Sequence, residues 1–246
     1  MHADHFPRGI RGELKWQIQK LLIKKVAKNI ITDSHASKHD IQQVLGFSPE
    51  HVFLIPLAPR VVFKPNKLSE VRKKYKLNNK YVLYVGDVNW NKNIPGLLDS
   101  VSNLPLVCVG KAFVDYQTEM PKNVKKLGFV SDEELAGLYS MAEVLVYPSY
   151  AEGFGFPVLE AMACGCPVVT SNVSSLVEIA GPAIMVNPYK PDDIRRGIDL
   201  ALGLSASARH DMVASGFEWV KKFTWKKTAH ATAKIYEKTI NNYTRI

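Results

Sequence analysis

Cysteine is scarce in this sequence, with three residues among 246, at positions 108, 164 and 166. An odd count with a Cys-Gly-Cys pair fits neither a disulfide framework nor the spacing of a zinc site or a redox Cys-x-x-Cys. We therefore predict that Cys108, Cys164 and Cys166 are buried thiols without a chemical role.

Long apolar runs are missing as well. No stretch of about 18 or more apolar residues occurs, so the sequence predicts no membrane-spanning helix. Hydrophobic residues still make up 46% of the chain, which is enough for a sizeable core. The first seven residues, Met-His-Ala-Asp-His-Phe-Pro, contain no apolar leader region. We expect a cytoplasmic protein built as one large or two modest domains.

Metal-binding patterns are also absent. The sequence contains no Asp-x-Asp triplet and no His, Cys and carboxylate cluster with ligand spacing. Of the seven histidines, none lies between Tyr81 and Tyr189. We predict no metal site.

The net charge of +9 is unevenly distributed along the chain. Residues 1–80 contain 16 Lys/Arg and 6 Asp/Glu, residues 81–220 contain 9 and 16, and residues 221–246 contain 7 and 1. A nucleic-acid binder usually combines a basic groove with interleaved aromatic residues, so we expect no nucleic-acid partner. The basic ends favour peripheral contact with the inner face of a membrane or with a lipid phosphate, although solvated surfaces alone would also explain them.

From Tyr81 onward, short apolar strands alternate with helices. This alternation predicts a doubly wound, Rossmann-like parallel sheet with helices on both faces, in the α/β class. The expected strands are 81–88, 106–109, 124–129, 144–148, 167–171 and 183–186, and the expected helices are 94–102, 132–141, 156–164, 174–180, 191–204, 207–223 and 226–242.

The chain before Tyr81 has a different pattern. Glu13–Lys28 places apolar residues at helical spacing beside many lysines, and we expect it to pack on a core more readily than on a membrane. Strands at 29–34 and 51–56 flank a helix at 37–45 that ends at Gly46. A proline-rich linker with one helix at 68–75 follows.

The stretch from Glu152 to Glu160 carries the most chemistry. It reads as a glycine loop joining a buried strand to a helix, with Pro157 in the first helical turn. Gly153 and Gly155 let the backbone approach a ligand closely, and the N–H groups of the helix start favour an anion. Glu152 and Glu160 would then flank a phosphate-sized site and accept hydrogen bonds from sugar or ribose hydroxyls. The alternative interpretation is a glycine-rich connection with two solvated glutamates.

Taken with Gly86…Lys92-Asn93 and Gly128-Phe-Val-Ser-Asp, this stretch resembles the family-four retaining glycosyltransferases of the two-Rossmann-domain (GT-B) type. The resemblance covers nearly the whole chain and is strongest from about Tyr81 to Pro188. It implies a nucleotide diphosphate sugar, GDP- or UDP-linked, as donor and no cofactor. It also implies catalytic roles for Glu152, facing the donor sugar, and Lys92, facing the diphosphate. The implied donor-binding residues are Glu160 at the ribose, Phe129 and Val130 at the base through their backbone, and Gly153, Phe154, Gly155, Gly86, Asn93, Gly110 and Lys111.

The resemblance also implies a domain plan. Residues 1–57 would be a remnant of the acceptor-side domain, 58–79 a hinge, 80–224 the donor-binding domain, and 225–246 a helix that crosses back to the N-terminal part. His2 and His5 match the family's acceptor-side His-Asp pair only loosely. Asp87, Asn89 and Asn91 stand where many relatives carry an arginine.

We therefore expect a metal-independent hexosyltransferase, mannosyl-like, that acts on a lipid- or glycan-linked acceptor in cell-surface glycan synthesis. The alternative is a nucleotide-sugar-binding subunit or fragment that is inactive until another chain supplies the missing acceptor domain. An epimerase on the same fold is a third interpretation, disfavoured because the C-terminal half lacks an acid–histidine set. The short N-terminal part leads us to expect that this chain binds donor but transfers sugar poorly alone.

Overall fold

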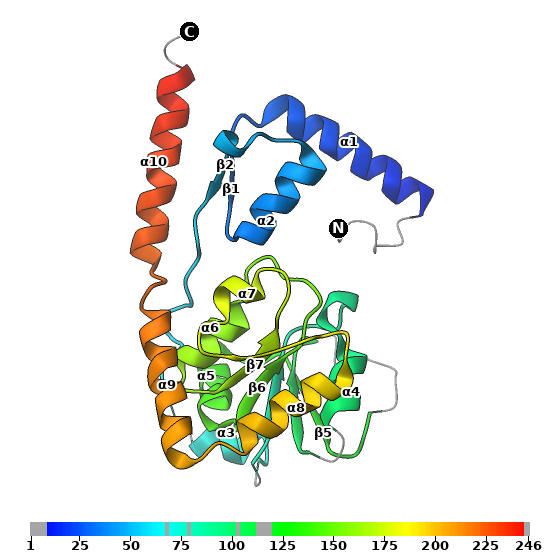
Figure 1. Cartoon of the computed structure of the whole chain (residues 1–246), viewed down its shortest axis with the longest axis vertical. Helices are drawn as coiled ribbons and strands as arrows, with labels where there is room; N and C mark the ends of the chain where they lie inside the picture. The colour runs from blue at the N-terminus through cyan, green and yellow to red at the C-terminus, as the bar shows by residue number, and fades with distance from the viewer. Residues whose placement is uncertain (1–8, 67–68, 78–79, 102–103, 112–119, 244–246) are drawn as a thin grey trace. The chain divides into compact units, whose positions relative to one another are not determined.

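The computed structural model describes residues 9–66, 69–77, 80–101, 104–111 and 120–243 (Figure 1). The chain forms two compact units. One comprises Met1–Leu57 with Thr224–Ile246, and the other comprises Ala58–Phe223. His2 and His5 lie outside the described residues.

The second unit is built on a six-stranded sheet in the order β5-β4-β3-β6-β7-β8. All of its strand pairs are parallel, as predicted. β3, β4, β6 and β7 are buried along their whole length, which explains why they are mostly apolar and rich in Val and Leu. The strands are β3 (Val82–Val85), β4 (Leu106–Val109), β5 (Val124–Gly128), β6 (Val144–Tyr147), β7 (Val168–Ser171) and β8 (Ile184–Val186).

Helices cover both faces of this sheet (Figure 1). α4 packs against α8, while α6 packs against α5 and α9. A Ser131–Glu134 capping box starts α5 as predicted. The helices of this unit are α3 (Ser69–Lys74), α4 (Ile94–Val101), α5 (Asp132–Met141), α6 (Phe156–Ala163), α7 (Leu176–Ile179), α8 (Pro191–Leu202) and α9 (Ala206–Val220), with a 3₁₀ turn at Trp90–Lys92.

The first unit joins both ends of the chain. Its parallel strands β1 (Ile30–Thr32) and β2 (Val52–Leu54) accompany α1 (Ile10–Val26), α2 (His35–Asp40) and α10 (Trp225–Tyr243). A π-helical turn at Ile41–Leu45 extends α2, and a 3₁₀ turn at Pro49–His51 precedes β2. The Thr228 hydroxyl donates to the Pro56 carbonyl at 2.7 Å, and the Asn29 amide donates to Thr239 Oγ1 at 2.8 Å. These bonds connect α10 to the residues that flank β1 and β2.

α1 differs from its prediction. None of its residues is buried, and Leu14, Leu21 and Val26 are exposed. The expected packing of this helix on a core is therefore wrong for the described residues. The reason is that apolar and basic side chains mix around the helix and do not separate into two faces. No helix in the described part of the chain has the length and apolar character needed to cross a bilayer.

Candidate functional site

The predicted site residues in the described part of the chain lie at or just after the ends of β3, β4, β5 and β6, at the carboxyl edge of the sheet, except for Glu160 in α6. In an open parallel sheet this is the edge where ligands bind. β3 and β6 are neighbours, although about sixty residues separate them in sequence, so their loops meet. The topology thereby brings Lys92 and Glu152 together.

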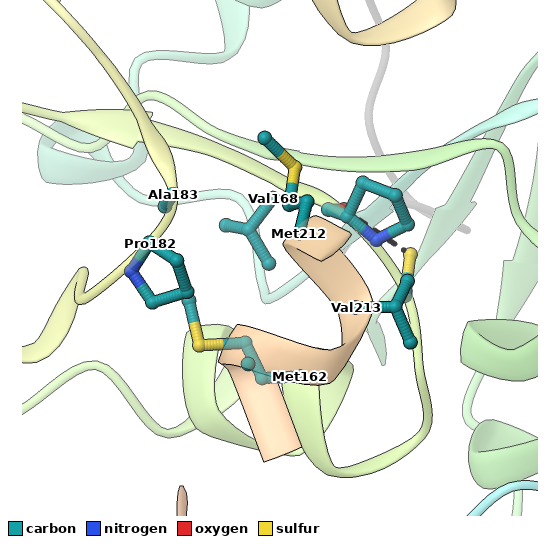
Figure 2. A pocket seen from close by; sticks show the side chains of 9 residues that line it. Met162, Val168, Pro182, Ala183, Met212 and Val213 are labelled. Carbon is teal, nitrogen blue, oxygen red and sulfur yellow. Dashed lines mark hydrogen bonds between the residues drawn. The ribbon is translucent and has the colours of Figure 1, made fainter. Parts of the chain in front are cut away.

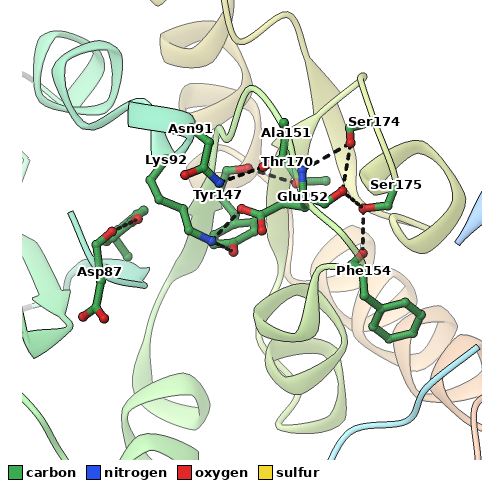
Figure 3. Close-up of polar contacts among 11 residues, drawn as sticks. Asp87, Asn91, Lys92, Tyr147, Ala151, Glu152, Phe154, Thr170, Ser174 and Ser175 are labelled. Carbon is green, nitrogen blue, oxygen red and sulfur yellow. Dashed lines mark hydrogen bonds and ion pairs between the residues drawn. The ribbon is translucent and has the colours of Figure 1, made fainter. Parts of the chain in front are cut away.

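Lys92 and Glu152 form an ion pair with 2.7 Å between Nζ and Oε1 (Figure 3). Both side chains are largely buried, with exposed fractions of 15% and 11%. The Lys92 ammonium also donates to the Tyr147 hydroxyl at 2.7 Å and lies 5.0 Å from the centre of that ring. A cation and a carboxylate are thus held together at the sheet edge.

The backbone of Glu152 is fixed by two serines that follow β7 (Figure 3). Its N–H donates to Ser174 Oγ at 3.2 Å. Its carbonyl accepts from Ser174 Oγ at 2.9 Å and from Ser175 Oγ at 3.0 Å. Ser175 also donates to the Phe154 carbonyl. The glycine loop is therefore held rigidly against the next strand.

The loop that carries Lys92 is fixed equally well. The Asn91 amide donates to the Ala151 carbonyl at 2.9 Å, and the Tyr150 N–H donates to the Asn91 carbonyl at 2.8 Å. Figure 3 shows the Asp87 carboxylate pointing away from the ion pair. Asn91 therefore joins the loop after β3 to the loop after β6.

Asn93 has structural contacts that the sequence did not predict. Its side chain is buried, donates to the carbonyls of Pro148 and Pro188 and accepts from the Gly96 N–H. The amide thus joins three loops, and the side chain points into the protein. The predicted donor contact of Asn93 remains a prediction beside these structural contacts.

Gly110 explains how the ends of β3 and β4 approach each other. A Cβ on this residue would lie 2.2 Å from the Gly86 carbonyl oxygen, so only glycine fits. The Gly86 N–H donates to the Val109 carbonyl, and the Gly110 N–H donates to the Gly128 carbonyl. Gly86 and Gly110 therefore align three strand ends into one edge.

Glu160 is buried in α6 and accepts a hydrogen bond from the Tyr139 hydroxyl at 3.1 Å. Burial raises the pKa of this carboxyl to about 7, more than the Tyr139 hydrogen bond and the nearby Arg60 lower it. A buried carboxyl with a raised pKa is typical of a functional site, and buried hydrogen-bond networks with a structural role contain such carboxyls too.

The start of α6 has the glycine loop that the sequence predicted. Gly155, at φ +110°, adopts a conformation that disfavours other residues, and no described side chain caps the helix. The Phe154 ring is buried against Phe156 and Phe223, so Phe154 has only its backbone to offer a ligand. The same holds for Gly153, which has no side chain.

Phe129 and Val130 differ sharply in exposure. The Phe129 side chain is 74% exposed, and the Lys111 ammonium lies 5.2 Å from its ring centre, whereas Val130 is buried. Lys111 and Phe129 therefore form a second cationic and aromatic surface at the ends of β4 and β5. Neither residue contacts the ion pair in the described contacts.

Other candidates for a site in the described residues include the cysteines, a small cavity and possible metal ligands. The three cysteines are buried and unpaired, as predicted, and burial raises the pKa of each thiol to about 12. A cavity of about 10 Å³ near Met162 and Met212 is lined by apolar side chains (Figure 2). Across the described ranges, no three His, Cys, Asp or Glu residues gather as a metal-ion site.

Sequence reasoning missed Tyr147, Ser174 and Ser175. Tyr147 looked like an ordinary residue of a buried strand, and only its place at the carboxyl end of β6 could have indicated a site role. The two serines carry no sequence signal, because their contacts depend on β7 lying beside β6.

The sequence matches the family model described as "Glycosyl transferases group 1" over residues 68–219. It is 33% identical to the O-antigen chain mannosyltransferase B of Escherichia coli over 232 residues, covering 86% of this chain and 61% of that protein. It is 32% identical to the MMP alpha-(1->4)-mannosyltransferase of Mycolicibacterium hassiacum, covering 88% of this chain and 56% of that protein. The chain thus spans less than two thirds of the length of these relatives.

Solved structures share the fold. The sucrose-phosphate synthase of Thermosynechococcus elongatus superposes with a TM-score of 0.77 at 26% identity, covering 92% of this chain and 62% of that chain. Anabaena Alr3699/HepE in complex with UDP-glucose superposes with a TM-score of 0.81 at 18% identity, covering 96% of this chain and 69% of that chain.

Proposed function

This chain belongs to the group 1 glycosyl transferases, and from that premise we propose that it binds a nucleotide diphosphate sugar at the carboxyl edge of β3 and β6. The reaction is the transfer of a hexosyl unit, mannosyl-like, to an acceptor hydroxyl with retention of configuration. The observation that carries the proposal is the Lys92–Glu152 ion pair beside the start of α6.

The ion pair supplies the two functions that such a transfer needs. Lys92 meets the diphosphate and stabilises the charge that develops on the departing nucleotide. The N-terminus of α6, with the backbone of Gly153, Phe154 and Gly155, favours the same anion. Lys92 and the helix terminus together take the role that a divalent cation has in metal-dependent transfers.

Glu152 turns toward the donor sugar once the phosphate competes for Lys92. Its backbone is fixed at both its N–H and its carbonyl, so its carboxylate can reorient without the loop moving. An ionised carboxylate only accepts hydrogen bonds, which suits sugar hydroxyls. The pairing with Lys92 also lowers the repulsion that Glu152 would exert on an approaching phosphate.

Glu160 holds the ribose, and the base lies at the backbone of Phe129 and Val130. Lys111 is the second candidate cation for the diphosphate, because it ends the strand next to β3. The printed names of two relatives, both mannosyltransferases, support a mannosyl unit. The UDP-glucose complex of the Anabaena protein makes UDP, beside GDP, a donor nucleotide to be tested.

The acceptor in this proposal is a lipid- or glycan-linked hydroxyl in cell-surface glycan synthesis. The O-antigen role printed for the Escherichia coli relative and the basic ends of the chain support it. Peripheral contact with the inner face of a membrane would place the enzyme beside such an acceptor. Donor binding without turnover on a cell-envelope lipid extract would favour the alternative, a binding subunit that needs a separate acceptor chain.

The proposal predicts that Lys92→Ala weakens UDP and GDP binding about tenfold or more, because a charged hydrogen bond is worth about 1.5–3 kcal/mol. Binding of the free nucleosides should change far less, since Lys92 meets charge and not the base. Calorimetric titration of each ligand measures both effects. A chelator should leave the affinities unchanged.

Lys80→Ala is the matched control for this experiment. Lys80 pairs with Glu143 at the opposite, amino edge of the same two strands. Its loss should leave all four affinities at the wild-type value. Equal losses for diphosphate and nucleoside in Lys92→Ala, or a strict magnesium requirement, would contradict the proposed site.

A further inference from the structure

Tyr147 is the third member of the cluster that holds Lys92, and neither the sequence nor the family resemblance gave it a role. Its hydroxyl accepts from the Lys92 ammonium at 2.7 Å, the same distance as the ion pair with Glu152 (Figure 3). The residue is almost completely buried and ends β6 directly before the loop that carries Glu152.

The ring and the backbone of Tyr147 each have a fixed partner. It stacks on Tyr84 of β3 with 6.3 Å between ring centres. Its carbonyl accepts from the Thr170 hydroxyl of β7 at 3.0 Å. The hydroxyl oxygen therefore occupies one defined place between the two strands that carry the site loops.

Tyr147 also keeps its proton. Burial, followed by the nearby Glu152 carboxylate, raises the pKa of its phenol well above the ordinary value. At neutral pH it is an uncharged acceptor for Lys92. This distinguishes it from Glu152, which holds the same ammonium but also neutralises its charge.

We propose that Tyr147 is a positioning residue for Lys92 that keeps the ammonium in place when an incoming diphosphate displaces Glu152. This inference rests on the proposed function. A lysine side chain has four rotatable bonds and loses much rotamer freedom when it is ordered. A neutral hydroxyl that remains in contact keeps the lysine ordered before, during and after the exchange of partners. The full positive charge then faces the phosphate.

In the described contacts, the Lys92 ammonium uses fewer N–H donors than it has. A lysine ammonium has three N–H donors and no acceptor. Glu152 Oε1 and Tyr147 Oη take two of them in the described structure. When a phosphate oxygen replaces Glu152, Tyr147 is the contact common to both states.

The test is Tyr147→Phe, which keeps the buried ring and removes only the hydroxyl. We expect UDP and GDP to bind about tenfold more weakly, with uridine and guanosine unchanged, because the hydroxyl holds the lysine that meets the diphosphate and not the base. Calorimetry gives the four affinities. An equal loss for nucleosides and diphosphates would overturn the proposal, since it would indicate a general distortion of the site.

A second readout needs no ligand. Acetic anhydride acetylates the unprotonated amine fraction of each lysine at a rate that depends on accessibility, mobility and hydrogen bonding, and mass spectrometry gives the rate at Lys92. Tyr147→Phe should raise that rate about threefold or more, because one of two hydrogen bonds that hold the ammonium is lost. An unchanged rate would also overturn the proposal.

Tyr81→Phe is the matched control for both readouts. Tyr81 is a buried tyrosine just before β3 whose hydroxyl donates to the Leu138 carbonyl. Tyr81→Phe should leave the four affinities and the labelling rate of Lys92 at wild-type values. If Tyr81→Phe and Tyr147→Phe change these quantities equally, Tyr147 has no specific role in positioning Lys92. If the wild-type chain binds neither diphosphate, the proposed function fails, and the labelling rate alone decides whether Tyr147 positions Lys92.

Discussion

Glu152 and Glu160 are eight residues apart, yet the fold places them in opposite environments. Glu152 pairs with a lysine, whereas Glu160 is enclosed between α5 and α6 beside a tyrosine hydroxyl. The sequence predicted two carboxylates around one anion site. The difference between them could not be predicted, because Tyr139 and Lys92 lie on other elements.

The buried Glu160 makes the stability of the protein depend on pH. Burial raises its pKa from 4.5 to about 7, so between these values the folded state binds more protons than the unfolded state. Stability therefore decreases as pH rises through this window. The loss of stability from ionising the buried Glu160 is absent below pH 4.5 and complete above about pH 7. For a shift of this size it is about 3 kcal/mol at most.

Glu160→Gln should remove this penalty, because glutamine is neutral at every pH and still offers an oxygen to Tyr139. We expect the variant to gain up to about 3 kcal/mol over the wild type at about pH 8 and little at about pH 5. Urea denaturation at the two pH values measures the difference. Glu133→Gln, at an exposed position of α5, is the control. An identical gain at both pH values would show that burial does not set the ionisation of Glu160.

Asn93 and Tyr147 mark the limit of sequence reasoning at single residues. The sequence indicated that Lys92 belongs to a site loop but could not show how its side chain is held. Asn93 contacts Pro148 and Pro188, and Tyr147 reaches across from another strand. Such contacts depend on strand order, which local patterns do not encode.

At the scale of elements, local signals predicted most of the second unit. β4 and α5 have the predicted bounds, and Gly165 ends α6 with φ +76°. The predicted strand from Tyr81 to Val88 is shorter in the structure, because the chain turns at Gly86. α1 was misjudged for a different reason: helical spacing predicted the helix correctly but not what its side chains would contact.

Two helix-interior glycines give opposite predictions for the same substitution. A Cβ on Gly216 of α9 would lie 3.5 Å from Met162 Cβ, an ordinary contact beside the small apolar cavity of Figure 2. A Cβ on Gly197 of α8 would lie 2.5 Å from Val186 Cγ1. Gly216→Ala should therefore stabilise the protein by about 0.5–1 kcal/mol, since alanine favours helix and costs no space.

Gly197→Ala should destabilise the protein by about 1–3 kcal/mol, because β-branched side chains on the buried strands below α8 cannot move aside without strain. Thermal or urea unfolding of both variants measures the two effects on one scale. Each glycine serves as the control for the other. Shifts of the same sign would contradict the packing of α8 and α9 on the sheet described above.

At the scale of the whole molecule, the chain passes from the first unit into the second and returns. Met1–Leu57 and Thr224–Ile246 form one unit, and Ala58–Phe223 between them in the sequence form the other. All of the proposed donor contacts lie within the second unit. The sequence predicted residues 58–79 as a hinge, 80–224 as the donor-binding domain and 1–57 as part of an acceptor domain, and these assignments remain predictions. Donor binding is therefore a property of the second unit that can be measured without an acceptor.

The most direct test of the central claim is calorimetric titration of UDP and GDP into the wild-type chain and into Glu160→Ala. The wild type should bind at least one diphosphate. Glu160→Ala should weaken that binding by about 1.5–3 kcal/mol, the cost of losing a hydrogen-bond acceptor for the ribose hydroxyls. A circular dichroism spectrum like that of the wild type shows that the variant is folded. Unchanged affinity in a folded Glu160→Ala variant, or no binding of either diphosphate by the wild type, would contradict a nucleotide-sugar site on this edge of the sheet.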